Sequence, residues 1–116
     1  TFVEGDVTSL EFPDSTFDLV MDFGIIHHVP NWRDALAEVH RALRSGGEFL
    51  FEELSVETWE RGIGIPFKRI LEHPYDEMFK KQEFVGELKA LGFDVEIHEN
   101  SPLGFYHFWG RAEKTS

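Results

Sequence analysis

The stretch FDLVMDFGIIHHVPNWRDALAEVHRALRSGGEFLFEEL, residues 17–54, decides the fold of this chain. Its first part, Phe17–Ile26, is almost continuously apolar, which is typical of a strand buried on both faces, and we expect it at the centre of a parallel sheet. Asn31 then caps a helix whose apolar residues recur at three- and four-residue spacing. Arg41 and Arg44 lie in its last turn, where positive charge meets the carbonyl end of the helix dipole. Ser45-Gly46-Gly47 ends this helix, with its first glycine in the left-handed position, and residues 48–52 begin the next strand. A strand, a helix and a strand of this length predict a right-handed βαβ crossover.

The remainder of the chain predicts one more helix and an antiparallel hairpin. Lys81–Leu91 places its apolar residues on one face and is followed by Gly92, which is typical of an amphipathic helix and its end. Asp94–Glu99 and Phe105–Arg111 alternate apolar and polar residues around a turn, as the strands of a hairpin do. The 116 residues are therefore expected to form a single α/β domain, a mostly parallel sheet with this hairpin at its far edge.

Composition excludes several classes of protein. Aromatic residues make up 15% of the chain, and no apolar stretch approaches the roughly 20 residues that cross a bilayer, so we expect a folded domain without a membrane span. The formal net charge of −11 repels phosphate backbones and disfavours a nucleic-acid partner. The absence of cysteine excludes disulfides, thiolate metal sites and cysteine nucleophiles, and it fits a reducing compartment such as the cytoplasm.

Residues 5–54 also carry a recognisable pattern. It runs Gly-Asp-x-x-x-Leu-x-Phe-Pro-x-x-x-Phe-Asp-x-Val, followed by His-His-Val, a helix and a Ser-Gly-Gly turn into an apolar strand. This pattern resembles the class I S-adenosylmethionine-dependent methyltransferases of the small-molecule type. The resemblance implies a Rossmann-like fold and covers the C-terminal half of the domain, because the family's first motif, an acidic-Gly-x-Gly-x-Gly turn, would lie upstream of Thr1. Residues 1–116 would then be one partial methyltransferase domain, with residues 55–75 as the insertion over the substrate pocket.

The resemblance implies that the parent protein transfers a methyl group from S-adenosylmethionine to a small or lipophilic acceptor. In such enzymes a substrate atom attacks the sulfonium carbon in line, and catalysis consists largely of aligning the two reactants. No protein nucleophile is required, so His28 and Glu52 are named only as weak candidates for a base. Glu52 and Glu53, at the end of the predicted strand, could bind or deprotonate a substrate, although a carboxylate at the end of a strand is more often simply solvated. No metal is implied.

The resemblance also assigns contacts with the cofactor. Asp6 would accept a hydrogen bond from the adenine amino group, and the backbone N–H of Val7 would meet a ring nitrogen. The alternative is that Asp6 is a turn residue bonded to its own backbone. The segment that leaves the central strand would line the methionine side of the cofactor and the entrance to the acceptor pocket through Asp22, Phe23, Gly24 and His28.

Two further groups of residues have competing interpretations. The His27-His28 pair suggests a metal site or a general base, but adjacent residues leaving a strand point in opposite directions, so a structural or pocket-wall role is favoured. Trp59, Phe67 and the run 105–109 could line an apolar acceptor pocket, although core packing is the plainer explanation for most of them.

The sequence also permits a function that is not enzymatic. The chain could be a non-catalytic remnant or an interaction module whose half-sheet is completed by a partner or by itself. Without the family's first strand the Phe17–Ile26 edge would be unpaired, and it contains no Lys or Pro that would prevent pairing with another chain. We therefore expect a homodimer that joins these edges or exchanges the segment Thr1–Gly5.

Overall fold

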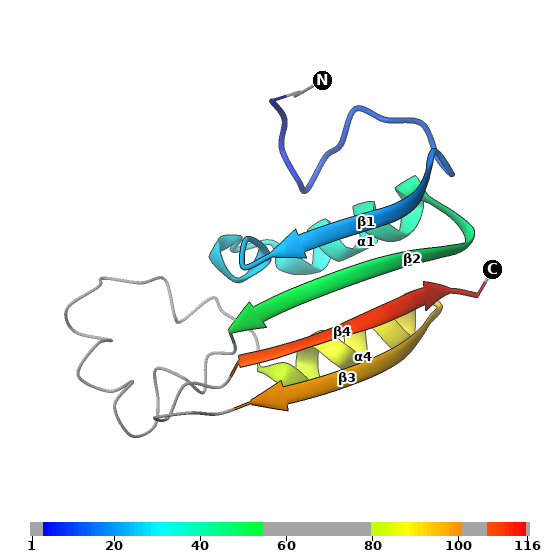
Figure 1. Ribbon diagram of the computed structural model, residues 1–116. Helices are drawn as coiled ribbons and strands as arrows, with labels where there is room; N and C mark the ends of the chain where they lie inside the picture. Colours follow the sequence, from blue (N-terminus) through cyan, green and yellow to red (C-terminus); the bar gives the residue numbers. More distant parts are fainter. Residues whose placement is uncertain (1–3, 55–79, 101–106, 116) are drawn as a thin grey trace.

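The computed structural model describes residues 4–54, 80–100 and 107–115 (Figure 1). The strands of this part form a sheet of order β1-β2-β4-β3. They are β1 (Phe17–Phe23), β2 (Leu43–Leu54), β3 (Phe93–Asn100) and β4 (His107–Lys114). β1 and β2 run parallel, whereas β4 is antiparallel to both β2 and β3. The predicted α/β sheet with a hairpin at its far edge is confirmed.

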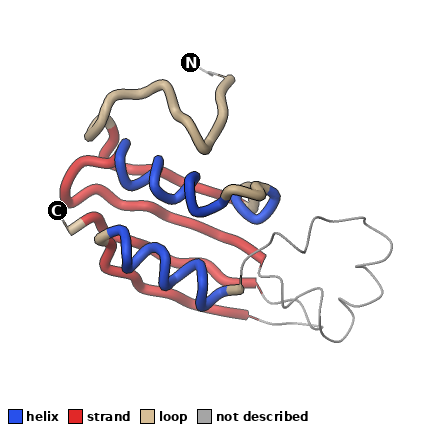
Figure 2. Tube along the Cα trace, turned by 180° about the vertical axis from the view of Figure 1, so that it is seen from behind, coloured by secondary structure: helices blue, strands red, loops and turns tan. Residues whose placement is uncertain are grey.

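Two helices, α1 (Trp32–Ala42) and α4 (Lys81–Leu91), cover the same face of this sheet (Figure 2). The bounds of α4 are those that its periodicity predicts. Glu83 stabilises the first turn of α4 by accepting the Lys80 N–H at 2.9 Å, and Gly92 ends the helix with a left-handed φ of +105°. No helix in the described ranges is both long and apolar enough to cross a membrane.

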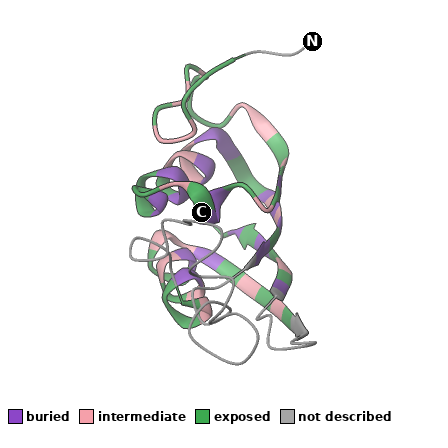
Figure 3. Cartoon of the chain, turned by 90° about the vertical axis from the view of Figure 1, so that its left-hand side faces the viewer, coloured by how far each residue is buried: buried purple, intermediate pink, exposed green. Residues whose placement is uncertain are grey.

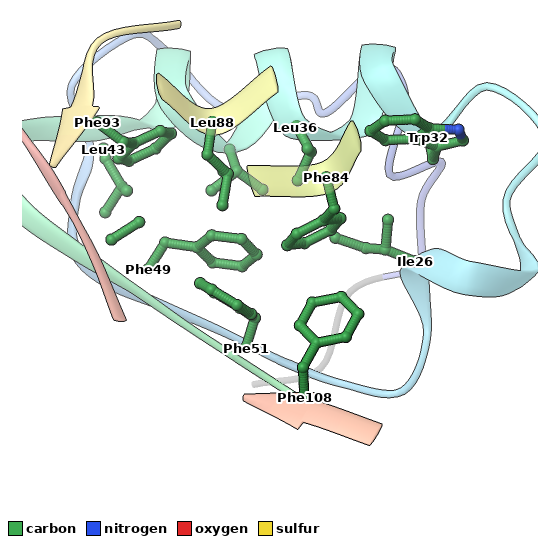
Figure 4. Packing of buried hydrophobic residues seen from close by; sticks show 12 residues of the cluster. Ile26, Trp32, Leu36, Leu43, Phe49, Phe51, Phe84, Leu88, Phe93 and Phe108 are labelled. Atoms are coloured by element: carbon green, nitrogen blue, oxygen red, sulfur yellow. The ribbon is translucent and has the colours of Figure 1, made fainter. Parts of the chain in front are cut away.

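The hydrophobic core lies between the two helices and the sheet (Figure 3). Its centre is a cluster of aromatic rings in which Phe84 of α4 packs on Phe51 and Phe108, with ring centroids 5.2 and 5.4 Å apart (Figure 4). These rings bury a large apolar area and fix the distance of α4 from the sheet. Phe108, from the run considered for an acceptor pocket, is therefore a core residue.

The opposite face of β1 is uncovered within the described part of the chain. Leu19, Met21 and Phe23 are 48%, 54% and 65% exposed. The expectation of a central strand buried on both faces is wrong for this structure, because β1 ends the strand order and pairs with β2 alone. The apolar composition of β1 is thus not explained by contacts within the described residues.

The connection from α1 to β2 also differs from the prediction. The helix ends at Ala42, and the chain is already extended at Leu43, where ψ is 143°. Gly46 has the expected left-handed φ of +81°, but it lies inside β2, where the pairing register with β1 shifts. It therefore forms an irregularity in the strand rather than the end of the helix.

Candidate functional site

The candidate site lies where the parallel strands β1 and β2 end. In an α/β sheet, ligands bind beyond the carboxyl ends of such strands. β1 brings Asp22 to this edge, and β2 brings Glu53. Between Asp22 and α1 the chain leaves the sheet at Gly24, whose φ is +74°, and forms the 3₁₀ turn η1 (Ile26–His28). The turn replaces the last part of the strand expected over Phe17–Ile26.

Glu53 is the buried anchor of this turn. Its Oε1 accepts the backbone N–H of Ile26 at 2.9 Å, and its Oε2 accepts the N–H of His27 at 3.2 Å and ring Nδ1 of the same histidine at 2.6 Å. The carboxylate thus supplies acceptors to the backbone N–H groups that begin the helical turn, where negative charge is favoured. The residue is only 1% exposed.

Asp22 lies beside Glu53 and is 7% exposed. Its Oδ1 accepts the N–H of Ile25 at 3.1 Å, whereas its Oδ2 is buried and has no hydrogen-bond partner within the described residues. Burial first, and then the neighbouring Glu53 carboxyl, raise the pKa of Asp22 to about 8. Burial raises the pKa of Glu53 as well. Because Glu53 receives N–H donors on both oxygens, its ionised form is stabilised more than that of Asp22, which accepts one N–H.

The two histidines lie together rather than apart. Their ring centroids are 4.1 Å apart, because both residues belong to the 3₁₀ turn and not to an extended strand. The expectation that these adjacent side chains point in opposite directions is therefore wrong. His27 is buried against Glu53, whereas His28 is exposed, and burial is the first cause that lowers the pKa of each imidazole. The described residues contain no cluster of three His, Cys, Asp or Glu that could hold a metal ion.

A cavity of about 380 Å³ opens beside β1 and is largely apolar. Its walls are formed by Val7, Val20, Met21, Asp22, Phe23, Ile25, Ile26, Val39 and Phe49. The cavity brings together Val7 from the N-terminal loop with Asp22 and Phe23 from the end of β1, which are three of the residues predicted to contact a cofactor. Gly24 follows them and donates its N–H to the carbonyl of Glu52 at 2.7 Å.

Asp6 is exposed and forms a local turn. Its Oδ1 accepts both the N–H of Thr8 at 2.8 Å and the Thr8 hydroxyl at 2.7 Å, and its carbonyl accepts the N–H of Ser9 at 3.0 Å. The Thr8 side chain is the main reason that the pKa of Asp6 is lowered. The turn interpretation of Asp6 is thus realised, while its Oδ2 makes no hydrogen bond within the described residues and stays open to a ligand.

The neighbouring glutamates of β2 have opposite surroundings. Glu52, the candidate base, is exposed, whereas Glu53 is buried on the face that carries Phe49 and Phe51. The sequence predicts Glu52 as a site residue, whereas the structure buries Glu53 at the site. The period of two along the strand was the available signal, since residues 49, 51 and 53 share one face.

Of the remaining aromatic candidates, Trp109 is described by the structure and does not line this cavity. Trp109 stacks on the ring of His98, with centroids 5.8 Å apart, on the strand pair β3–β4. Trp59, Phe67, Phe105 and Tyr106 lie outside the described residues, as does the whole of the 55–75 insertion.

Residues 1–51 of the chain match the profile of the methyltransferase domain family. The chain is similar to the S-adenosylmethionine-dependent methyltransferases in sequence and in fold. Sterol 24-C-methyltransferase of Yarrowia lipolytica is 29% identical over 115 residues, which cover 86% of this chain and 28% of that protein. Fatty-acid O-methyltransferase of Mycolicibacterium smegmatis is 39% identical over 66 residues, which cover 53% of this chain and 24% of that protein.

A methyltransferase of known structure has the same arrangement of strands and helices. Phosphoethanolamine N-methyltransferase 2 of Haemonchus contortus, solved in complex with S-adenosyl-L-methionine, superposes with a TM-score of 0.77 at 15% identity. The superposition covers 96% of this chain and 36% of that one. The expected Rossmann-like methyltransferase fold is confirmed. The chain spans only about a quarter of the length of the curated relatives described above, 28% and 24%.

Proposed function

We propose that the protein transfers a methyl group from S-adenosylmethionine to a small or lipophilic acceptor. The observation that carries this proposal is the cavity at the carboxyl end of β1, which gathers Val7, Asp22 and Phe23 in a chain whose first 51 residues match the methyltransferase domain. A concave, mostly apolar site with a few polar groups is the usual form of a small-molecule site.

The proposed roles of the residues follow from their positions. Asp6 and the N–H of Val7 take the adenine, with Oδ2 of Asp6 as the acceptor that Thr8 leaves open. Asp22, Phe23, Gly24 and His28, in the segment that leaves β1, would hold the methionine part. Bound S-adenosylmethionine supplies an electrophilic methyl group, so the protein has to hold and align the reactants and needs no nucleophile of its own. His28 and Glu52 remain candidate bases for an acceptor that must lose a proton.

The acceptor class is proposed from the relatives. Their names refer to sterols and fatty acids, which are lipophilic molecules. A net charge of −11 argues against a nucleic-acid acceptor. A cytoplasmic location completes the proposal and rests on the cysteine-free composition.

The test is calorimetric titration of the full natural protein with S-adenosylmethionine, followed by transfer of a labelled methyl group to a panel of acceptors. The panel contains a sterol, a free fatty acid and phosphoethanolamine. We expect saturable cofactor binding and methylation of a lipophilic member. A folded protein that binds no S-adenosylmethionine would refute the proposal, and exclusive methylation of phosphoethanolamine would refute its lipophilic part.

A second candidate function is self-association through β1. It is favoured by the strand's position at the end of the described sheet and by the exposed side chains of Leu19, Met21 and Phe23. We propose a homodimer in which two such edges pair. Sedimentation at micromolar concentration tests it: the chain should sediment as a dimer, Met21→Lys as a monomer, and the control Glu113→Lys on β4 as a dimer. A monomeric unmodified chain would exclude this candidate.

A further inference from the structure

Arg41 connects helix α1 to the loop that precedes β1. Its Nη1 donates to the carbonyl of Phe12 at 2.7 Å and to Oδ1 of Asp14 at 2.8 Å, and its Nη2 donates to the carbonyl of Leu10 at 3.0 Å. The sequence predicted a cation in the last turn of the helix, where it meets the helix dipole. The structure directs its guanidinium to the backbone of a segment 29 to 31 residues away.

Glu38, one turn earlier on α1, completes this connection. Its Oε1 and Oε2 accept Nε and Nη2 of Arg41 at 3.0 and 2.9 Å, a two-point contact that holds the guanidinium in one orientation. Oε2 also accepts the N–H of Leu10 at 2.7 Å. Both backbone polar groups of Leu10 are therefore bound by this pair, and Arg41 lowers the pKa of Glu38 so that the pair is charged at neutral pH.

The anchored residue lies next to the turn proposed to bind adenine. Residues 6–9 form a hydrogen-bonded turn through Asp6, Thr8 and Ser9, and Leu10 follows it directly. Within the described residues, no hydrogen bond joins residues 6–9 to another element of the fold. The position of this turn on the molecule therefore depends on the bonds made at Leu10 and on the packing of Val7 beside β1.

We propose that Arg41 and Glu38 are positioning residues for the cofactor. They hold the Asp6–Val7 turn beside the cavity, and so they set the affinity for the adenine part of S-adenosylmethionine. The inference rests on the proposed function, because it assumes that this turn meets adenine. Neither residue touches the reacting atoms in this scheme. Their loss should change the binding of the cofactor and not the rate of methyl transfer once it is bound.

The planar fork of arginine is needed for this task. Arg41 reaches two carbonyls and both oxygens of Glu38 at once, whereas the ammonium of lysine is a single point charge that cannot span them. Arg41→Lys keeps the charge and the helix dipole interaction while it removes the two-point geometry. It therefore separates positioning from a general effect of charge.

The experiment compares Arg41→Lys and Arg41→Met with Arg44→Met in the full natural protein. Arg44 is the matched control, because it is the same residue type three positions later and forms an exposed ion pair with Asp18. Amide hydrogen exchange at residues 8–12 without cofactor measures the loop, and KM and kcat for S-adenosylmethionine measure its consequence. For both Arg41 variants we expect faster exchange at Leu10, a KM for the cofactor raised about tenfold, as for the loss of one charge-assisted hydrogen bond, and kcat changed less than about twofold.

The outcomes separate the inference from the function on which it rests. Faster exchange at Leu10 with an unchanged KM would overturn the positioning role and leave the proposed function intact. Arg44→Met raising KM as much as Arg41→Met would also overturn it, since a general loss of charge would then explain the effect. An unmodified protein that binds no S-adenosylmethionine would overturn the proposed function itself, and the inference with it.

Discussion

Two loops border the proposed site, and they are held in opposite ways. The turn after β1 is held from inside by Glu53, whose side chain is fully buried. The loop before β1 is held from outside by Arg41, 30% of whose side chain is exposed. Removing an interior acceptor leaves N–H donors without water, whereas the groups around a half-exposed guanidinium can be solvated. One loop is therefore tied to the stability of the fold, while the other can change with little cost to folding.

The largest change in stability is expected when the buried acceptor Glu53 is removed. Glu53→Ala leaves the N–H groups of Ile26 and His27 without their acceptor and should reduce the free energy of unfolding by about 2–5 kcal/mol, from roughly 1–3 kcal/mol for each buried donor left unsatisfied. Urea denaturation at pH 7 measures it, with the exposed Glu113→Ala as a control that should change by less than about 0.5 kcal/mol. A loss below about 1 kcal/mol for Glu53→Ala would show that the turn does not depend on this carboxylate.

A smaller effect, on cofactor affinity, is expected at Asp6 in the loop before β1. In the full natural protein, Asp6→Ala should weaken S-adenosylmethionine binding by roughly 1.5–3 kcal/mol, the value of one charge-assisted hydrogen bond, because it removes the acceptor proposed for adenine. Stability should hardly change, since Asp6 is exposed and bonds only to its own turn in the described structure. Calorimetry and thermal unfolding measure the two quantities. If the variant unfolds at lower temperature while the folded protein keeps its affinity, Asp6 is a turn residue and not a ligand.

The buried carboxyl of Asp22 should make the free energy of unfolding depend on pH. Asp22 has a folded-state pKa of about 8 against an ordinary value of 3.8, so between these values the folded state holds a proton that the unfolded state has lost. Its contribution is therefore lost as pH rises, by up to about 1.4 kcal/mol per pH unit for one proton. Asp22→Asn should remove this slope, which denaturation at pH 5, 6, 7 and 8 measures as the difference from the unmodified chain.

That difference isolates Asp22 from other groups. The lowered pKa of His27 acts in the opposite direction, because the folded state then binds fewer protons than the unfolded state below neutral pH. The histidine is present in both proteins, so the difference between them contains only the part of the His27 pKa shift that Asp22 causes. Parallel pH profiles for the two proteins would mean that Asp22 is ionised in the folded state.

Prediction from the sequence succeeded where the signal is local. The helix Lys81–Leu91 and the hairpin strands follow from their own periodicity, and the structure has them within a few residues. It failed at the end of β1, where the continuous apolar run predicted a strand to Ile26. There the backbone turns at Gly24, and Glu53 accepts the N–H of Ile26, which is 27 residues away from Glu53 in the sequence.

At the candidate site, too, the residues with a local sequence signal were predicted, and those whose partners are distant in the sequence were not. Asp22, Phe23 and Val7 were named from the pattern of residues, and the cavity joins them. Glu53 was passed over in favour of Glu52, because two adjacent carboxylates differ only in the face of the strand on which they lie. Arg41 was assigned to the helix dipole, since its partners at Leu10 and Phe12 have no spacing in the sequence that indicates a contact.

The sequence by itself determined the order of strands and helices, the family resemblance and the stretch from which the site is built. The order of strands and helices depends on backbone preference and on side-chain periods of two or 3.6 residues, which act between near neighbours, and the resemblance depends on the motif within residues 5–54. Only the tertiary structure decided which acid is buried, why the pKa of Asp22 is raised and which side chains hold the two loops. These depend on desolvation and on hydrogen bonds between groups 26 to 31 residues apart, which exist only after the chain has folded.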